Sequence, residues 1–213
     1  NLQGIVKLVD ASECLSSNKG KDKRLDVDSV LRLISSNVTT DHVFLLNKKD
    51  IESNEYNLSI NRYKYSYDNF EGRELRDFVD VIKGDSPFYG SRKKLVKFKN
   101  LVSDNLEYEL DTSSLSEDDL PNNCFVISES CILMALIGNK INPTFFFYEG
   151  ESIAVTNNII ALKVDETKIM VPYLISELRS EEVEKQLSIF RTGTAMTFIK
   201  KSDLLKIKIC IFY

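Results

Sequence analysis

Apolar positions in the first third of the chain come in short runs. Residues 4–10 and 42–47 are largely β-branched and aliphatic and are bounded by polar residues, which predicts two short buried strands. Between them, apolar residues recur at three- and four-residue spacing after Asp26, a residue type that caps helices, so a helix is expected over 27–36. The pattern predicts a small strand-helix-strand unit.

Polar stretches separate these elements and close the unit. The Lys-rich residues 16–24 are expected to form a loop, and the polar, aromatic residues 48–66 to form an irregular connector. We therefore predict two domains, residues 1–65 and residues 66–213.

The larger domain contains β-branched and aromatic runs broken by Asn, Gly or Pro, as in strands joined by turns. A short helix is expected over 74–82, and the apolar spacing over 171–190 allows one helix with a break near Ser180 or two short helices. A loop over 191–204 and an alternating strand over 205–213 complete the chain. The pattern predicts an α+β fold, a curved and mostly antiparallel sheet with flanking short helices, with strands at 95–101, 124–130, 131–138, 144–150 and 158–164.

The composition is that of a folded globular protein, with 43% hydrophobic and 28% charged residues. No apolar run is long enough to cross a bilayer, and the first ten residues lack the layout of a signal peptide, so we expect a cytoplasmic protein without a membrane partner. The four cysteines form no CxxC pair and are expected to be free thiols.

Motifs for catalysis are missing from the sequence. His42 is the single histidine, and no GxSxG, HExxH or Gly-rich phosphate loop occurs. The acidic residues within 104–119 could serve as the carboxylates of a metal-dependent nuclease, but a solvated acidic face explains them more simply. We therefore expect no catalytic centre, no metal and no cofactor in this chain.

Positive charge gathers in two clusters, within residues 83–99 and 191–208, despite the formal net charge of −4. Both begin in Gly-containing loops next to hydroxyl residues, a combination that suits contacts to phosphates and base edges in DNA. The acidic stretch 104–119 is expected to face away from the duplex, which would make the molecule dipolar. The residues expected to face DNA are Lys83, Ser86, Arg92, Lys93, Lys94, Lys140, Thr194, Thr197, Lys200 and Lys201.

The order of segments in the larger domain resembles a known family. Residues 171–209, VPYLISELRSEEVEKQLSIFRTGTAMTFIKKSDLLKIKI, look like the closing motif of target-recognition domains in type I restriction-modification specificity subunits: a helix, a Gly-Thr loop, and Ile-x-Lys-x-Asp-Leu before a strand. LRDFVDVIKGDSPF is similar to the family's opening helix and glycine turn, and CILMALIGN and SIAVTNNIIALKV resemble its central strands. The resemblance covers residues 66–213.

The first third resembles a neighbouring protein of the same systems. GIVKLVDASECLSSNKGKDKRLDVDSVLRLI and DIESNEYNLSINRYKY look like the C-terminal tail of N6-adenine DNA methyltransferases, whose hallmark YNL-x-I-x-RY is present at Tyr56–Tyr63. The methyltransferase's Asn-Pro-Pro-aromatic motif and cofactor-binding glycines are absent from this sequence. The departure implies that this chain neither methylates DNA nor binds S-adenosylmethionine.

Together the two resemblances imply the C-terminal part of a fused modification-specificity polypeptide. Such a chain is expected to recognise a sequence in double-stranded DNA and to position a methyltransferase catalytic domain or subunit over an adenine. The alternative is a protein-interaction or assembly module that docks the methyltransferase or other subunits without direct DNA readout. Salt-sensitive binding to duplex DNA separates the two possibilities.

Overall fold

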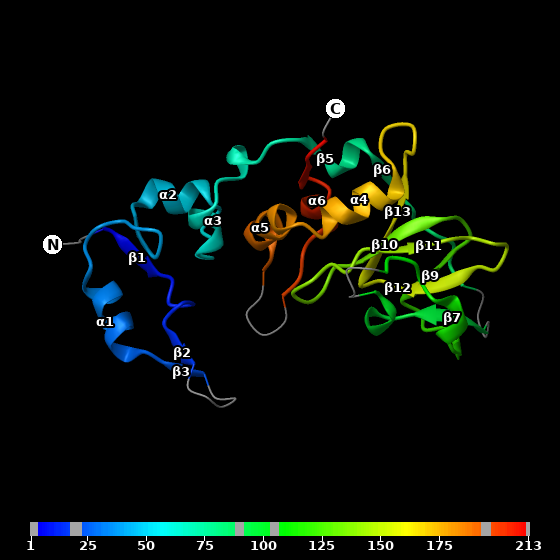
Figure 1. The fold of residues 1–213 in the computed structure, drawn as a ribbon, viewed down its shortest axis with the longest axis horizontal. Coiled ribbons are helices and arrows are strands. Elements are labelled where there is room, and N and C mark those ends of the chain that lie inside the picture. The colour runs from blue at the N-terminus through cyan, green and yellow to red at the C-terminus, as the bar shows by residue number, and fades with distance from the viewer. Residues whose placement is uncertain (1–3, 18–22, 88–91, 103–106, 193–196, 212–213) are drawn as a thin grey trace. The chain divides into compact units, whose positions relative to one another are not determined.

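The computed structural model describes residues 4–17, 23–87, 92–102, 107–192 and 197–211. The chain divides into two compact units, Asn1–Ser66 and Tyr67–Tyr213 (Figure 1). Each unit has its own sheets and helices, and each is described separately below.

The first unit contains a two-stranded antiparallel sheet of β1 (Val6–Val9) and β4 (Val43–Leu46). Between these strands in the sequence lies α1 (Val27–Ser35), whose N-cap Asp26 accepts a hydrogen bond from the backbone N–H of Ser29. The predicted strand-helix-strand order is therefore confirmed. No residue of α1 is buried, although its apolar spacing is typical of a packed face.

A second hairpin occupies the edges of the expected loop over 16–24. β2 (Leu15–Ser17) pairs antiparallel with β3 (Lys23–Leu25). Two strands can pair through backbone hydrogen bonds without apolar side chains. The Lys-rich sequence therefore gave no pattern from which a strand could be predicted. The loop prediction is wrong at both of its ends.

Two short helices, α2 (Lys48–Ser53) and α3 (Asn61–Lys64), lie where an irregular connector was expected. The helix α2 begins with a capping box: the Asn47 side chain accepts hydrogen bonds from the backbone N–H groups of Lys49 and Asp50, and the Asp50 carboxylate accepts one from the N–H of Asn47. An Asn three residues before an acidic residue is a helix-start signal. The connector prediction overlooked it.

The second unit contains two four-stranded sheets. The first has the order β11-β10-β13-β6, all antiparallel, with β11 (Thr144–Phe146), β10 (Cys131–Ala135), β13 (Ile159–Val164) and β6 (Val79–Val81). The second has the order β8-β7-β12-β9, in which β12 and β7 run parallel, with β8 (Glu117–Asp119), β7 (Arg92–Val96), β12 (Ile153–Thr156) and β9 (Cys124–Ile127). The predicted α+β, mostly antiparallel fold is confirmed.

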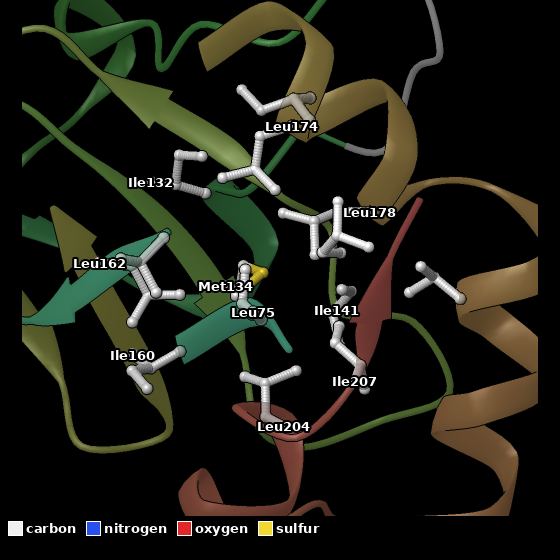
Figure 2. Packing of buried hydrophobic residues seen from close by; sticks show 14 of the residues in the cluster. Leu75, Ile132, Met134, Ile141, Ile160, Leu162, Leu174, Leu178, Leu204 and Ile207 are labelled. Carbon is white, nitrogen blue, oxygen red and sulfur yellow. The ribbon is translucent and has the colours of Figure 1, made fainter. Parts of the chain in front are cut away.

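Strands β10 and β13 are buried on both faces, which explains their nearly uninterrupted apolar sequences. One face meets the helices, and Figure 2 shows members of that cluster: Ile132, Met134, Ile160, Leu162, Leu174 and Leu178. The other face packs against the second sheet in a separate cluster with Leu133, Ile159, Ala161, Val96, Ile127 and Val155. The unit therefore has three layers, helices on sheet on sheet.

Helices α4 (Val171–Leu178) and α5 (Glu181–Phe190) form the helical layer. Ser180 caps α5, because its side chain accepts a hydrogen bond from the backbone N–H of Val183. The predicted break near Ser180 is confirmed in its two-helix form.

Residues 74–82 form a 3-10 turn, η2 (Leu75–Asp77), and strand β6 instead of the expected helix. Leu75 and Phe78 are fully buried, and β6 pairs with β13 so that Val79 lies opposite Val164. Apolar residues three and four apart fit a turn followed by a strand as well as they fit a short helix, so periodicity alone could not decide.

The C-terminal segment contains a short helix, α6 (Lys201–Leu204), and strand β14 (Lys208–Ile209), which pairs with β5 (Arg73–Glu74). The expected loop over 191–204 therefore ends in a helix, and the expected strand over 205–213 is much shorter. The remaining 3-10 turns are η1 (Tyr67–Asn69), η3 (Phe98–Asn100) and η4 (Thr112–Ser114).

Two sequence expectations concern the whole chain. In the ranges that the structure describes, no helix is both long and apolar enough to cross a membrane. All four cysteines are free thiols, as predicted.

Candidate nucleic-acid interface

Arg92, Lys93 and Lys94 lie on strand β7 rather than in a loop. The antiparallel partner β8 places Asp119 opposite Arg92, Asp118 opposite Lys93 and Glu117 opposite Lys94. We call Arg92, Lys93, Lys94 and Lys97 the strand cluster. Its charge lies directly against an acidic strand.

Ion pairs neutralise most of the strand cluster. Lys97 Nζ lies 2.6 Å from Asp118 Oδ2, Lys94 Nζ lies 2.8 Å from Glu151 Oε2, and Arg92 Nε lies 3.6 Å from Asp119 Oδ1. Lys93 donates a hydrogen bond to the Ser152 hydroxyl at 2.7 Å. The hydrogen bond from Lys97 holds the pKa of the Asp118 carboxyl below its ordinary value.

This pairing corrects the expectation of separate acidic and basic faces. Glu117–Asp119, the end of the acidic stretch, forms the edge strand β8 beside the basic strand β7. The sequence could not reveal this, because the chain between β7 and β8 contains two 3-10 turns and only the fold determines its path.

A different set of predicted residues is brought together at the turn after β10. The backbone N–H of Ala135 donates to the carbonyl of Ile141 at 2.7 Å, which closes the turn over 136–140. The N–H of Gly138 donates to the carbonyl of Thr197 at 2.8 Å, and the N–H of Ile199 donates to the carbonyl of Leu136 at 2.9 Å. Lys140 and the 197–201 segment are therefore neighbours in space.

Side chains reinforce this junction. The Thr197 hydroxyl donates to the side-chain oxygen of Asn139 at 3.0 Å. Lys200 is the N-cap residue of α6, Lys201 is its first residue, and Leu204 at its end is fully buried. Burial of a leucine side chain stabilises a fold by about 1.5–3 kcal/mol. Leu204 thus anchors the helix that presents Lys200 and Lys201 to solvent.

The two clusters differ in how their charges are partnered. Every other cation in the second unit has an ion pair or a hydrogen bond, but five exposed lysines have neither among the described residues. We call four of them the turn cluster: Lys99, Lys140, Lys200 and Lys201. The fifth is Lys83.

Lys83 and Ser86 belong to the segment between β6 and β7 and take no part in the backbone hydrogen bonds of the 136–140 turn. Lys83 lines a pocket with Asp80, Asp85 and Glu129, of which Glu129 is already paired with Lys163 in the same lining. The predicted Thr194 lies outside the described residues.

Neither Phe98 nor Lys99 was selected from the sequence as a site residue, although Lys99 belongs to the turn cluster and Phe98 lies beside the 136–140 turn. Gly138 has a positive φ of 94°, and a Cβ there would lie 3.5 Å from Cζ of Phe98, so the η3 turn packs against the 136–140 turn. Phe98 is 48% exposed, and Phe198 on the neighbouring segment is 44% exposed. The alternating sequence Lys97-Phe98-Lys99 was the available signal.

Two buried polar groups belong to Arg191 and Thr192, at the end of the described range 107–192. Arg191 forms an ion pair with Glu184 on α5, yet its Nη2 atom has no hydrogen-bond partner among the described residues. The Thr192 hydroxyl is equally unpartnered there. A pocket of about 340 Å³ opens beside Lys140 and includes Glu184 in its lining. Within the described ranges, no group of His, Cys, Asp or Glu could hold a metal ion.

Comparison with known proteins gives matches only at the level of structure. No family model matches the chain, and no curated protein matches its sequence. One matching solved structure is the type I restriction-modification S subunit from M. genitalium, with 14% identity over 64% of this chain and a TM-score of 0.35. A second is the HsdS subunit from Thermoanaerobacter tengcongensis, with 13% identity over 86% of this chain and a TM-score of 0.43.

A third match belongs to a structural study of complex assembly and conformational transition in the type I R-M system, with 12% identity over 86% of this chain and a TM-score of 0.46. The chain spans 33%, 42% and 54% of the lengths of these three chains.

Proposed function

We propose that the chain recognises a sequence in double-stranded DNA for a bacterial restriction-modification system. Residues 66–213 act as the reader, and residues 1–65 connect it to an N6-adenine methyltransferase catalytic domain or subunit. The proposal rests on the resemblance of the segments to target-recognition domains and on one observation of geometry. That observation is a set of exposed lysines, on the 136–140 turn and on the segments that contact it, that have no ion pair or hydrogen bond among the described residues.

The arrangement of the turn cluster suits a duplex. Lysines without an internal carboxylate are free to neutralise phosphates and release counterions, which supplies the sequence-independent part of the affinity. Asn139 and Thr197 lie among these lysines, and amide and hydroxyl side chains are groups that hydrogen-bond to base edges. In this proposal Lys140, Lys200 and Lys201 fix the register on the backbone, while Asn139 and Thr197 contribute to the choice of base.

Fluorescence anisotropy with a labelled duplex at about 50 mM and about 200 mM salt tests the proposal, since a protein that binds several phosphates loses affinity steeply over this range. Changing Lys200 and Lys201 to Ala should weaken binding at low salt. It should also flatten the salt dependence by about one unit of slope for each phosphate that is no longer neutralised.

The matched control is the double variant Lys163→Ala and Lys185→Ala. Both lysines are exposed but ion-paired, with Glu129 and Glu182 respectively, so the control removes the same charge from other parts of the unit. It should leave the salt slope unchanged. Absence of salt-sensitive binding by the unaltered chain would overturn the DNA-reading proposal.

A second candidate function, docking of the methyltransferase, is favoured by the first unit. Val27, Leu31 and Ile34 lie on one face of α1 and are 59%, 53% and 50% exposed. An exposed apolar face of this kind is typical of protein–protein contacts. Leu31→Asp should abolish co-elution with the methyltransferase catalytic domain in size-exclusion chromatography and leave DNA binding unchanged. Persisting co-elution would argue against docking through α1.

A further inference from the structure

Phe98 is held at the surface by its neighbours on both sides. Val96 before it is fully buried, and Leu101 after it is 5% exposed. The η3 turn between them is closed by two hydrogen bonds of 2.9 Å, from the N–H of Lys97 to the Asn100 side chain and from the N–H of Asn100 to the carbonyl of Lys97. The exposure of Phe98 is therefore a property of an anchored turn.

The surroundings of Phe98 combine an apolar surface with lysines that have no partner within the described part of the chain. Its ring lies beside Gly138, two residues before Lys140, and Lys99 follows it directly in the chain. Glycine leaves the ring uncovered where a larger side chain would pack on it. An exposed aromatic ring among free lysines matches a partner that carries both negative charge and flat aromatic groups, and nucleic acid has both.

We infer that Phe98 stacks on an unstacked base of the bound DNA, an inference that rests on the proposed DNA-reading function. Aromatic side chains on nucleic-acid-binding surfaces stack on exposed bases or enter base steps and distort the duplex. Phe98 would then favour DNA whose bases separate easily. The lysines around it would hold the adjacent phosphates.

Phe147 provides a matched control in the same unit. It is 59% exposed, slightly more than Phe98, and its ring lies 6.4 Å from that of Phe145. The residues that follow it include Glu149 and Glu151, so its sequence neighbours repel phosphate. Phe147→Ala removes as much exposed aromatic surface without touching the turn cluster.

The experiment compares two duplexes of identical length, one fully paired and one with a central mismatched bubble of about three base pairs. Anisotropy titrations of the full chain should show tighter binding to the bubble duplex. Phe98→Ala should reduce affinity for the bubble duplex about tenfold, the size expected when one base no longer stacks on the protein, and should leave the salt slope unchanged because the charge is the same. Phe98→Tyr and Phe147→Ala should both retain the preference.

The possible failures are distinguishable. If the unaltered chain binds both duplexes with steep salt dependence but without preference, or if Phe98→Ala keeps the preference, the stacking role is wrong and the DNA-reading function stands. If the unaltered chain binds neither duplex in a salt-sensitive way, the proposed function fails and the stacking role fails with it. Circular-dichroism melting of Phe98→Ala, whose ring is half exposed, checks that the variant is folded.

Discussion

The strand cluster and the turn cluster look alike in the sequence and differ in the structure. The strand cluster consists of three lysines and Arg92 and the turn cluster of four lysines, and both lie near glycine and hydroxyl residues in the sequence. On β7 the charges face the acidic strand β8 and are largely neutralised by ion pairs, whereas at the 136–140 turn and α6 the lysines have no partner among the described residues. A candidate DNA surface is therefore identified by lysines that have no ion-pair partner among the described residues, and not by the number of basic residues in a stretch of sequence.

The largest expected effect is a loss of folding stability when the buried leucine that anchors α6 is truncated. Leu204→Ala should lower the free energy of unfolding of the second unit by about 2–5 kcal/mol, because a fully buried leucine leaves a cavity in the core (Figure 2). Urea unfolding followed by circular dichroism measures the change. Leu205→Ala, at a half-buried neighbouring position, should cost distinctly less. Equal destabilisation by both variants would mean that α6 is not anchored through Leu204.

The next effect should come from releasing the strand cluster. Asp118→Asn, Asp119→Asn and Glu151→Gln together remove the carboxylates that pair with Lys97, Arg92 and Lys94. If the ion pairs prevent the strand cluster from binding DNA, their removal should raise DNA affinity near 0.1 M salt about tenfold or more. The salt slope should steepen by up to about three units.

The complementary change removes those cations from the unaltered chain. Arg92→Gln, Lys94→Gln and Lys97→Gln should affect DNA affinity only slightly, because these charges are already neutralised by internal carboxylates. A decrease in DNA affinity as large as that of the Lys200 and Lys201 double variant would mean that the strand cluster binds DNA as the turn cluster does.

Some features of the second unit could be predicted from the sequence. The helix break at Ser180 and the central strands β10 and β13 carry local signals, a capping serine and nearly uninterrupted apolar sequences, and they were predicted. The neighbourhood of Lys140 and Thr197 depends on hydrogen bonds between residues about 60 positions apart in the sequence, yet both residues were selected by their local composition.

What the sequence could not supply was pairing between distant segments. Nothing near Lys97 indicates that Asp118 will lie 2.6 Å away, because that approach follows from the register of β7 and β8. The same reason explains why Phe98 was not selected, since its ring lies beside a glycine about forty residues later in the chain. Local patterns therefore predicted the central strands and the two helices around Ser180 but not the 3-10 turn and strand at 74–82, and the tertiary fold decided which lysines are paired.

A smaller effect on stability is expected from substitution of Gly138, the glycine at which the η3 turn packs against the 136–140 turn. Gly138 has a positive φ, which side-chain-bearing residues adopt with strain, whereas a Cβ at 3.5 Å from Phe98 makes an ordinary contact. Gly138→Ala should therefore destabilise the second unit by about 1 kcal/mol through the backbone. Thermal melting measures this, with Gly150→Ala as a positive-φ control in open space. Gly150→Ala should leave DNA affinity intact, and Gly138→Ala should reduce it.

The smallest effect concerns the titration of Asp118. The hydrogen bond from Lys97 lowers the pKa of this carboxyl from its ordinary value of 3.8. A carboxyl with a lowered folded-state pKa contributes stability that is fully present above 3.8 and is lost as the pH falls through the lowered pKa. NMR titration of the Asp118 carboxyl carbon should give a midpoint below 3.8, and Lys97→Ala should shift that midpoint upwards.

Asp111 provides the control for that titration, since its pKa is lowered by hydrogen bonds from Ser113 and not by a lysine. Its midpoint should not move in Lys97→Ala. An Asp118 midpoint that also stays in place would mean that the Lys97 ion pair is not maintained in solution. Lys97 would then belong with the free lysines of the turn cluster, and its replacement by Ala should flatten the salt dependence of DNA binding as the replacement of Lys200 does.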